Sequence, residues 1–189
     1  MPRRYANGTR LTPLPDKMAV PAFLRGAPLG LGLLAAVIAA VIDQATKLWL
    51  LHGFGLTDWS RVPITSFLDL VLAWNPGISY GWFQQVGPLG QWVLLVLKVI
   101  AVVLLLVWLA RTRSHLVGLA LGLIIGGAIG NAIDRAVHGA VMDFVLFHIT
   151  AANWTFEWYV FNFADAAIVV GVIGLVYESL FLQDAVKVP

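Results

Sequence analysis

Four aspartates are the residues of this sequence best placed to do chemistry, because each lies at or beside the end of a long apolar stretch. They are Asp43, Asp134, Asp143 and Asp165. Two carboxyl groups held about 3 Å apart cannot both ionise, so one keeps a proton while the other acts as a base on water. Such a pair could hydrolyse a peptide bond without a metal ion. The sequence alone does not show which two aspartates meet.

Amide and basic side chains lie close to these aspartates along the chain. They are Lys47, Asn75, Asn131, Arg135 and Asn162. Polar side chains at membrane depth are costly, and a cluster of them normally marks a functional cavity. One aspartate at a helix end would be read as a cap or a solvated group. Four of them near one side of so uncharged a chain favour a site.

Two other kinds of site can be drawn from the same residues. His138, Asp143 and His148 could form a zinc site with two histidines and one carboxylate. Their spacing of five fits neither a helix face nor a strand face, and no HExxH motif is present. A transporter could use the aspartates and Lys98 as a proton relay. The polar groups lie toward one surface, however, and no internal duplication is visible.

The composition shows what must position these residues. Of the 189 residues, 60% are hydrophobic and 12% are charged, whereas a soluble domain carries about 25% charged residues. The chain is therefore neither a soluble globule, nor disordered, nor a nucleic-acid binder, but an integral membrane protein. It contains no cysteine, which excludes thiol nucleophiles and cysteine-based metal sites. Ser79 and Ser179 have no evident base nearby, which disfavours serine catalysis.

Four stretches are long enough to cross a membrane, which takes about 20 residues. They span residues 27–51, 92–110, 116–133 and 166–182. None alternates like a strand, so an all-α polytopic membrane protein is predicted. The membrane domain is expected over 27–183, with loops at 52–90 and 138–161. Residues 1–26 and 184–189 are expected to form cytoplasmic tails, the first of them disordered.

The basic residues predict the orientation. They concentrate in the two tails and the 111–115 loop, whereas the two longer loops contain only Arg61. Since basic residues favour the cytoplasmic side, both termini are expected there and the two longer loops outside. In the third span, glycines recur every fourth residue at Gly118, Gly122, Gly126 and Gly130. They predict close packing against another helix.

The first outer loop has a strand pattern over residues 64–72 and a turn at 75–77, after which 78–83 could return as a second strand. A small antiparallel β element at the outer membrane surface is therefore predicted. Tryptophans are suited to an aromatic belt at the membrane interface. The candidates are Trp49, Trp82, Trp92 and Trp158.

Five motifs occur in the order typical of one family. They are Asp43-Gln44-Ala45-Thr46-Lys47, Trp74-Asn75-Pro76-Gly77, Gly127-Ala128-Ile129-Gly130-Asn131-Ala132-Ile133-Asp134-Arg135, Val141-Met142-Asp143-Phe144 and Phe161-Asn162-Phe163-Ala164-Asp165-Ala166-Ala167. Over residues 27–183 the chain resembles bacterial lipoprotein signal peptidases, the signal peptidase II family. It departs from the family pattern at Ile78-Ser79-Tyr80, where small residues followed by Phe are usual.

The resemblance implies an inner-membrane aspartic endopeptidase with four helices and a small periplasmic sheet. Its activity would be removal of signal peptides from diacylglyceryl-modified prolipoproteins, just before the lipid-bearing cysteine. Asp143 and Asp165 would be the catalytic pair. The implied substrate-site residues are Asn75, Asn131, Arg135 and Asn162, and the implied supports are Asp43, Lys47, Gly77 and Asp134.

Asp134 is the rival candidate for a catalytic role, but its place before Arg135 favours an ion pair that orders the site. The resemblance implies no cofactor and no metal. Its implied partners are prolipoproteins and membrane lipids, with no nucleic acid, and the enzyme would act as a monomer with its active site near the periplasmic surface.

Overall fold

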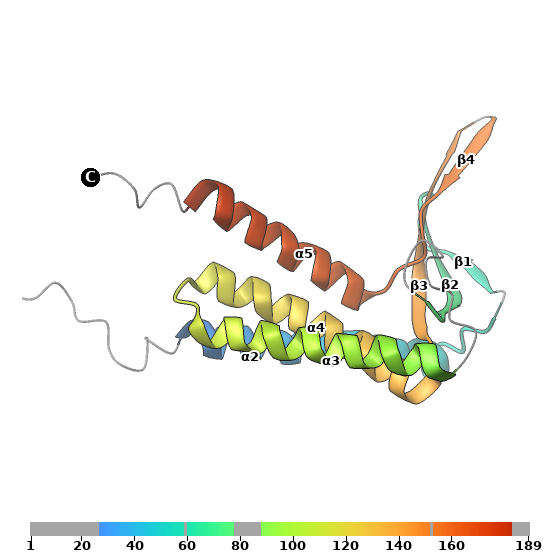
Figure 1. The fold of residues 1–189 in the computed structure, drawn as a ribbon. Helices are drawn as coiled ribbons and strands as arrows, with labels where there is room; N and C mark the ends of the chain where they lie inside the picture. Colours follow the sequence, from blue (N-terminus) through green and yellow to red (C-terminus); the bar gives the residue numbers. More distant parts are fainter. Residues whose placement is uncertain (1–26, 59, 78–87, 152, 183–189) are drawn as a thin grey trace, which may run out of the picture.

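The computed structural model describes residues 27–58, 60–77, 88–151 and 153–182, which form four long helices with a small sheet across one end (Figure 1). The helices are α2 (Ala27–Leu48), α3 (Pro88–Arg111), α4 (His115–His138) and α5 (Phe163–Tyr177). Two of them continue in π-helical turns, α2 in η1 (Trp49–Gly53) and α5 in η2 (Glu178–Leu182). Counted with these turns, each of the four is long and apolar enough to cross a membrane. The predicted set of four spans is thus confirmed.

Helices α4 and α5 reach further toward the sheet than predicted. α4 continues to His138 because the chain turns only at Gly139, whose φ of 72° ends the helix in the left-handed conformation. α5 begins at Phe163 because Asn162 caps it in a capping box with Asp165. Both extensions bring polar residues into regular helix, which fixes the direction of their side chains.

Within the described residues, the sheet has four antiparallel strands in the order β1 (Arg61–Pro63), β2 (Leu68–Asn75), β3 (Val141–Ala151) and β4 (Trp154–Glu157). The predicted strand over 64–72 is present in shifted form as β2. Its neighbours are β1 and β3, and the return strand predicted over 78–83 lies outside the described residues. The connection predicted over 138–161 contains β3 and β4, two strands that the sequence analysis did not predict.

Glycines allow α2 and α4 to approach closely. A Cβ on Gly122 would lie 2.2 Å from the carbonyl oxygen of Gly32, and one on Gly126 would lie 2.4 Å from that of Ala36. Neither position could accept a methyl group without moving a backbone. The close packing predicted from the glycine stripe is confirmed, and it continues to the level of Asp43, whose Oδ2 would lie 2.6 Å from a Cβ on Gly130.

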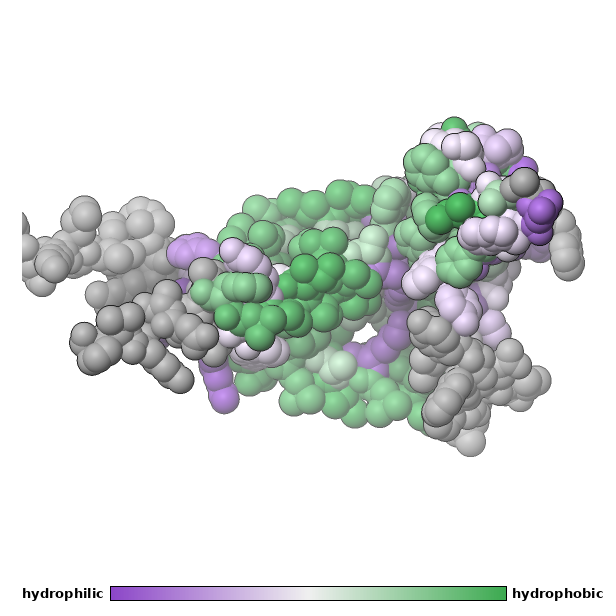
Figure 2. Space-filling model, turned by 90° about the horizontal axis from the view of Figure 1, so that it is seen from above, coloured by the Kyte–Doolittle hydropathy of each residue, from purple (hydrophilic) through white to green (hydrophobic). Residues whose placement is uncertain are grey.

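The molecule's surface is divided by polarity. Figure 2 shows a largely hydrophobic surface along the helices, with hydrophilic residues visible where the helices meet the sheet. A separate apolar cluster of Leu50, Leu56, Met142 and Phe144 joins the end of α2 to β3. This cluster packs the first half of β3 against the end of α2, so that Asp143 lies at the junction between the helices and the sheet.

Candidate active site

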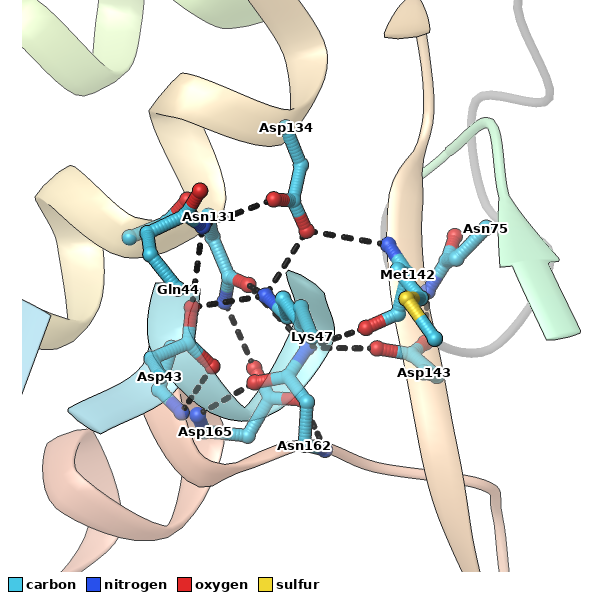
Figure 3. Close-up of polar contacts among 12 residues, drawn as sticks. Asp43, Gln44, Lys47, Asn75, Asn131, Asp134, Met142, Asp143, Asn162 and Asp165 are labelled. Carbon is cyan, nitrogen blue, oxygen red and sulfur yellow. Dashed lines mark hydrogen bonds and ion pairs between the residues drawn. The ribbon is translucent and has the colours of Figure 1, made fainter. Parts of the chain in front are cut away.

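The polar residues predicted from the sequence gather at the junction between helices and sheet (Figure 3). They come from α2, the end of β2, α4, the start of β3 and the first turn of α5. Among them, those less than 9% exposed are Asp43, Lys47, Asn131, Asp134, Arg135, Asp143 and Asn162. Distant parts of the chain therefore contribute to one buried polar cluster.

Asp143 lies on β3 with only 4% of its surface exposed. Two amides donate to its carboxylate: Asn75 Nδ2 to Oδ2 at 3.1 Å and Asn162 Nδ2 to Oδ1 at 2.6 Å. Burial, followed by the negative charge of Asp165, raises the pKa of Asp143 to about 6. Asp143 therefore holds its proton more firmly than an ordinary aspartate.

Asp165 is the third residue of α5 and is partly exposed. Its Oδ2 accepts the backbone N–H of Asn162 at 3.2 Å, and Asn162 Oδ1 accepts the backbone N–H of Asp165 at 3.0 Å. Its Oδ1 accepts from Asn131 Nδ2 at 2.8 Å. The capping box and α4 together aim this carboxylate at the junction.

Asn162 connects the two aspartates. Its side chain has no exposed surface. The side-chain oxygen accepts the backbone N–H of Asp165, while the side-chain nitrogen donates to Asp143 and, at 3.0 Å, to Asn131 Oδ1. A buried amide with partners on both ends has one allowed orientation. Asn162 therefore ties the Asp143 carboxylate to the first turn of α5, while Asn131 binds the Asp165 carboxylate.

A lysine and two further aspartates lie on the other side of this network. Lys47 Nζ is 2.7 Å from Asp43 Oδ2 and 2.7 Å from Asp134 Oδ2, and all three side chains are at most 4% exposed. Asp43 Oδ1 also accepts the backbone N–H of Ala164 at 3.0 Å. This carboxylate of α2 therefore helps to hold the first turn of α5, where Asp165 lies.

The expected ion pair between Asp134 and Arg135 was wrong. Successive residues of a helix point about 100° apart. Asp134 accordingly faces Lys47 and the backbone N–H of Met142, which donates to it at 3.0 Å. Arg135 instead donates to the carbonyl of Gly77 at 2.6 Å and to that of Pro76 at 3.4 Å.

Gln44 was quoted in a motif but was given no role from the sequence. Its Nε2 donates to Asp134 Oδ1 at 2.8 Å and to the carbonyl of Gly130 at 3.1 Å. An amide at membrane depth beside Asp43 was a signal that could have been used. Gln44 ties α2 to α4 on the flank of the ion-paired group.

The turn predicted at 75–77 is present, with Asn75 Oδ1 accepting the backbone N–H of Gly77 at 3.1 Å. The same side chain donates to Asp143 through its nitrogen. Asn75 thus links the segment leaving β2 to the buried carboxylate. The segment Ile78-Ser79-Tyr80 lies outside the described residues.

The alternative sites do not assemble. His138 lies against the ring of Trp74, with ring centroids 5.1 Å apart, while His148 Nε2 is 3.2 Å from Asp69 Oδ2. In the described part of the chain, no three histidine or acidic residues are grouped to hold a metal ion, so His138, Asp143 and His148, whose spacing already disfavoured a zinc site, are not brought together. Lys98 has no hydrogen bond or ion pair with any described residue.

Comparison with known proteins then decides the family. The sequence model of the family described as "Signal peptidase (SPase) II" matches residues 35–181, which include every residue of the polar cluster. The chain belongs to the signal peptidase II family. It is accordingly an aspartic protease, and with its four apolar helices it is a membrane-embedded bacterial protein.

Relatives in the signal peptidase II family are similar over nearly their whole length. A lipoprotein signal peptidase of Rhodopseudomonas palustris (strain TIE-1) is 60% identical over 162 residues, which are 86% of this chain and 99% of that protein. One from Nitrobacter hamburgensis is 57% identical over the same shares.

The fold is also found among solved structures. A bacterial membrane enzyme solved at 2.3 Å resolution has a TM-score of 0.69 at 23% identity, covering 85% of this chain and 92% of its own. A second, solved at 1.9 Å, has a TM-score of 0.67 at 24% identity, covering 80% and 94%. The chain thus shares its fold with these two bacterial membrane enzymes.

Proposed function

We propose that this enzyme removes signal peptides from diacylglyceryl-modified prolipoproteins and cuts just before the lipid-bearing cysteine, using Asp143 and Asp165 to activate water. One observation carries the proposal. Asn162 holds the side chain of Asp143 and the first turn of α5 together, so two carboxyl groups from separate elements converge at one junction. The negative charge of Asp165 contributes to the raised pKa of Asp143.

The environments of the two carboxyl groups suggest separate roles. Asp143 is buried and its raised pKa favours the protonated form, so it donates its proton to the scissile carbonyl oxygen. Asp165 is partly exposed and reachable by water. Its carboxylate removes a proton from the water whose oxygen bonds to the carbonyl carbon.

The tetrahedral intermediate then breaks its carbon–nitrogen bond. Asp165 gives the proton that it took from water to the departing amine of the cysteine, and Asp143 recovers its proton from the intermediate's hydroxyl group. Both aspartates end in the state in which they began, and the net reaction adds one water to one peptide bond. The site needs no external oxidant, metal or cofactor for this sequence of steps.

The remaining polar residues fall into two proposed groups. Asn75, partly exposed beside Asp143, is placed to bind the peptide backbone of the substrate. Asn131, Asn162 and Arg135 belong to the substrate site as well, and their contacts favour positioning of the aspartates and of the 75–77 turn. The proposed supports are Asp43, Lys47, Gly77 and Asp134.

The proposed location is the bacterial inner membrane. Residues 27–183 form the membrane peptidase domain, both tails are cytoplasmic, and the sheet with the active site lies at the periplasmic surface, because the two longer loops at that end contain only one basic residue, Arg61. Cysteines placed singly at Ser114 and Asn153 in this cysteine-free chain report the orientation. In intact spheroplasts an impermeant thiol reagent should label Asn153→Cys and not Ser114→Cys; the opposite pattern would reverse the topology.

The function itself is tested with purified enzyme in proteoliposomes and one precursor prepared with and without its diacylglyceryl group. We expect cleavage of the lipidated form and much slower cleavage of the other, since anchoring in the bilayer positions the scissile bond. Equal cleavage of both forms would contradict the substrate assignment. The proposal further treats the enzyme as a monomer surrounded by lipid, so cleavage should follow enzyme concentration linearly.

The same assay separates the alternatives. Cleavage should survive EDTA and phenanthroline, and His138→Ala and His148→Ala should stay active, because neither histidine contacts the aspartate pair. Loss of activity with a chelator would favour a metal site. Ion flux that depends on Asp165, without cleavage of either precursor, would favour a transporter.

A further inference from the structure

Lys98 is an intramembrane cation that the aspartate network does not bind. It lies in the apolar span Trp92–Arg111, six residues from Trp92, which is about 9 Å along the helix at about 1.5 Å per residue. Apart from Lys98, residues 92–110 contain no charged side chain. A charge at this depth is costly and normally marks a functional site with a definite partner. Lys98 is therefore expected to have a partner that accepts hydrogen bonds.

Lys98 belongs to the side of α3 that faces the other helices. Leu94, one turn nearer the sheet, is only 9% exposed, and Val102, one turn further from it, packs against the buried core of the helices. Residues four apart share a face of a helix, and Lys98 itself is partly buried. Its neighbours Leu97 and Val99, in contrast, are 57% and 52% exposed. The lysine therefore lies on the packed face of α3 and not on its lipid face.

The described residues supply no acceptor for the ammonium of Lys98. Its charge interacts electrostatically with those of four active-site residues, which are, from the strongest interaction to the weakest, Arg135, Asp165, Lys47 and Asp134. No described carboxylate forms an ion pair with it, however. The strongest of the four interactions is repulsive, because Arg135 is also a cation, and such repulsion is relieved when an acceptor lies between the two groups. That acceptor must come from outside the described residues.

Arg135 has a donor without a partner as well. Its terminal nitrogens donate to the carbonyls of Pro76 and Gly77, but its Nε is buried and has no hydrogen-bond partner among the described residues. A buried donor that stays unpaired costs free energy. In Figure 2 the surface is hollowed where the helices meet the sheet, and hydrophilic residues are visible in the hollow. Two cationic side chains, from α3 and α4, thus have donors available for one ligand at this junction.

The substrate of the proposed reaction carries acceptors of the required kind. Its diacylglyceryl group is attached to the sulfur of the cysteine that follows the scissile bond, and each acyl chain is joined to the glyceryl unit by an ester. With the scissile bond at Asp143 and Asp165, the ester carbonyls lie only a few bonds away, on the side from which the acyl chains enter the bilayer. The long side chain of an intramembrane lysine extends toward the membrane surface, and ester groups border the hydrocarbon core there.

We propose that Lys98 is a substrate-binding residue whose ammonium donates to an ester carbonyl of the diacylglyceryl group, with Nε of Arg135 as a second donor beside it. This inference rests on the proposed function and adds to it the residue that recognises the lipid. The phosphate of a membrane phospholipid is the other acceptor available at a membrane surface. It lies further from the hydrocarbon core than the esters do, so the position of Lys98 inside the span favours the ester.

Two forms of one precursor test this contact. One carries the diacylglyceryl group, and the other carries a glyceryl group with two alkyl chains joined by ethers, which have no carbonyl. Both are cleaved in proteoliposomes of ether-linked phosphatidylcholine, so that the bilayer supplies no competing ester. Lys98→Met removes the charge at similar volume, and Lys98→Arg keeps a cationic donor. The measurement is kcat and KM for each precursor, and SDS titration checks that each variant is folded.

The unaltered enzyme should cleave the ester precursor with a kcat/KM at least about 10-fold higher than the ether precursor, because the ether form loses a hydrogen bond from a charged donor. Lys98→Met should lose about 10-fold on the ester precursor, mainly through a higher KM, and little on the ether precursor. Lys98→Arg should keep most of the preference for the ester. A loss that depends on the ester carbonyl is not expected of a residue that only supports the fold.

Several results would overturn the proposal. Equal kcat/KM for the two precursors in the unaltered enzyme would do so without any variant, as would unchanged kinetics in Lys98→Met. An equal loss on both precursors would exclude the ester as the ligand; if that loss changed on adding ether-linked phosphatidylglycerol, it would identify a phospholipid phosphate instead. All of these results leave the proposed function intact, which fails only if the unaltered enzyme does not cleave the diacylglyceryl-modified precursor or cleaves the unlipidated one equally well.

Discussion

Strand β3 has two halves that use the same backbone in opposite ways. From Val141 to Phe144 every residue is buried, and the one carboxylate among them is bound by two amides. From Ile149 to Ala151 every residue is exposed. Contacts with other elements determine the environment of each side chain in the first half. In the second half, the alternation of side chains along the strand determines it. A polar side chain in the first half therefore belongs to a network, whereas one in the second half belongs to a surface.

The largest difference between the halves should be in catalysis. Asp143→Asn and Asp165→Asn should each lower the rate of precursor cleavage by about 10²–10⁴-fold, because each removes one partner of the acid–base pair. The matched control is Asp58→Asn, an exposed aspartate ahead of the sheet, which should leave the rate unchanged. Cleavage is followed in proteoliposomes with inserted protein quantified by immunoblot. Retained activity in Asp143→Asn would contradict the assignment of the pair.

Stability gives the next largest effect, in the network behind the buried half of β3. Lys47→Met leaves Asp43 and Asp134 buried without their cation and should cost about 3–5 kcal/mol of unfolding free energy. Lys98→Met is the matched control, because Lys98 also lies in a membrane helix but has no ion pair among the described residues. SDS titration of both proteins in mixed micelles measures the difference. A control as unstable as Lys47→Met would refute the role given to the ion-paired group.

The raised pKa of Asp143, in the buried half of β3, predicts that the stability of the folded enzyme depends on pH. Its pKa is about 6 in the folded enzyme and 3.8 as a free group, so the folded state binds its proton more tightly and loses stability as pH rises between those values. The shift corresponds to about 3 kcal/mol. Asp143→Asn removes this titration. The stability of the variant relative to the unaltered enzyme should therefore increase from pH 4 to pH 7, and an unchanged difference would exclude the raised pKa.

The smallest effect should come from the exposed half. Phe156→Ala should change the unfolding free energy in detergent by no more than about 0.5 kcal/mol, as expected for an exposed side chain. Phe144→Ala on the buried half should cost about 3–5 kcal/mol, because Phe144 is 1% exposed within the cluster beneath the sheet. Equal losses in SDS titrations would show that the two halves are one packed unit.

The membrane spans and most of the polar cluster could be predicted from the sequence, because apolar length and intramembrane polar residues are local signals. The partner of Asp134 could not. Arg135 is its neighbour in sequence, but only the packing of α2 on α4 brings Lys47 to it. β3 was missed for a similar reason. Residues 141–144 are buried on both faces of the strand, so they do not alternate, and the partner strand lies some seventy residues earlier in the chain.

The ion pair between Asp43 and Lys47 has a consequence for biogenesis. These residues are one helical turn apart on α2, the first of the four spans to leave the ribosome, whereas Asp134 and Asn131 arrive only after all of α3 has been translated. During that interval α2 must enter the bilayer with an aspartate and a lysine but without α4. Because the two charges neutralise each other within their own helix, α2 can be inserted into the bilayer before α4 is present. When α4 packs against it, Lys47 keeps its ion pair with Asp43 and forms a second one with Asp134.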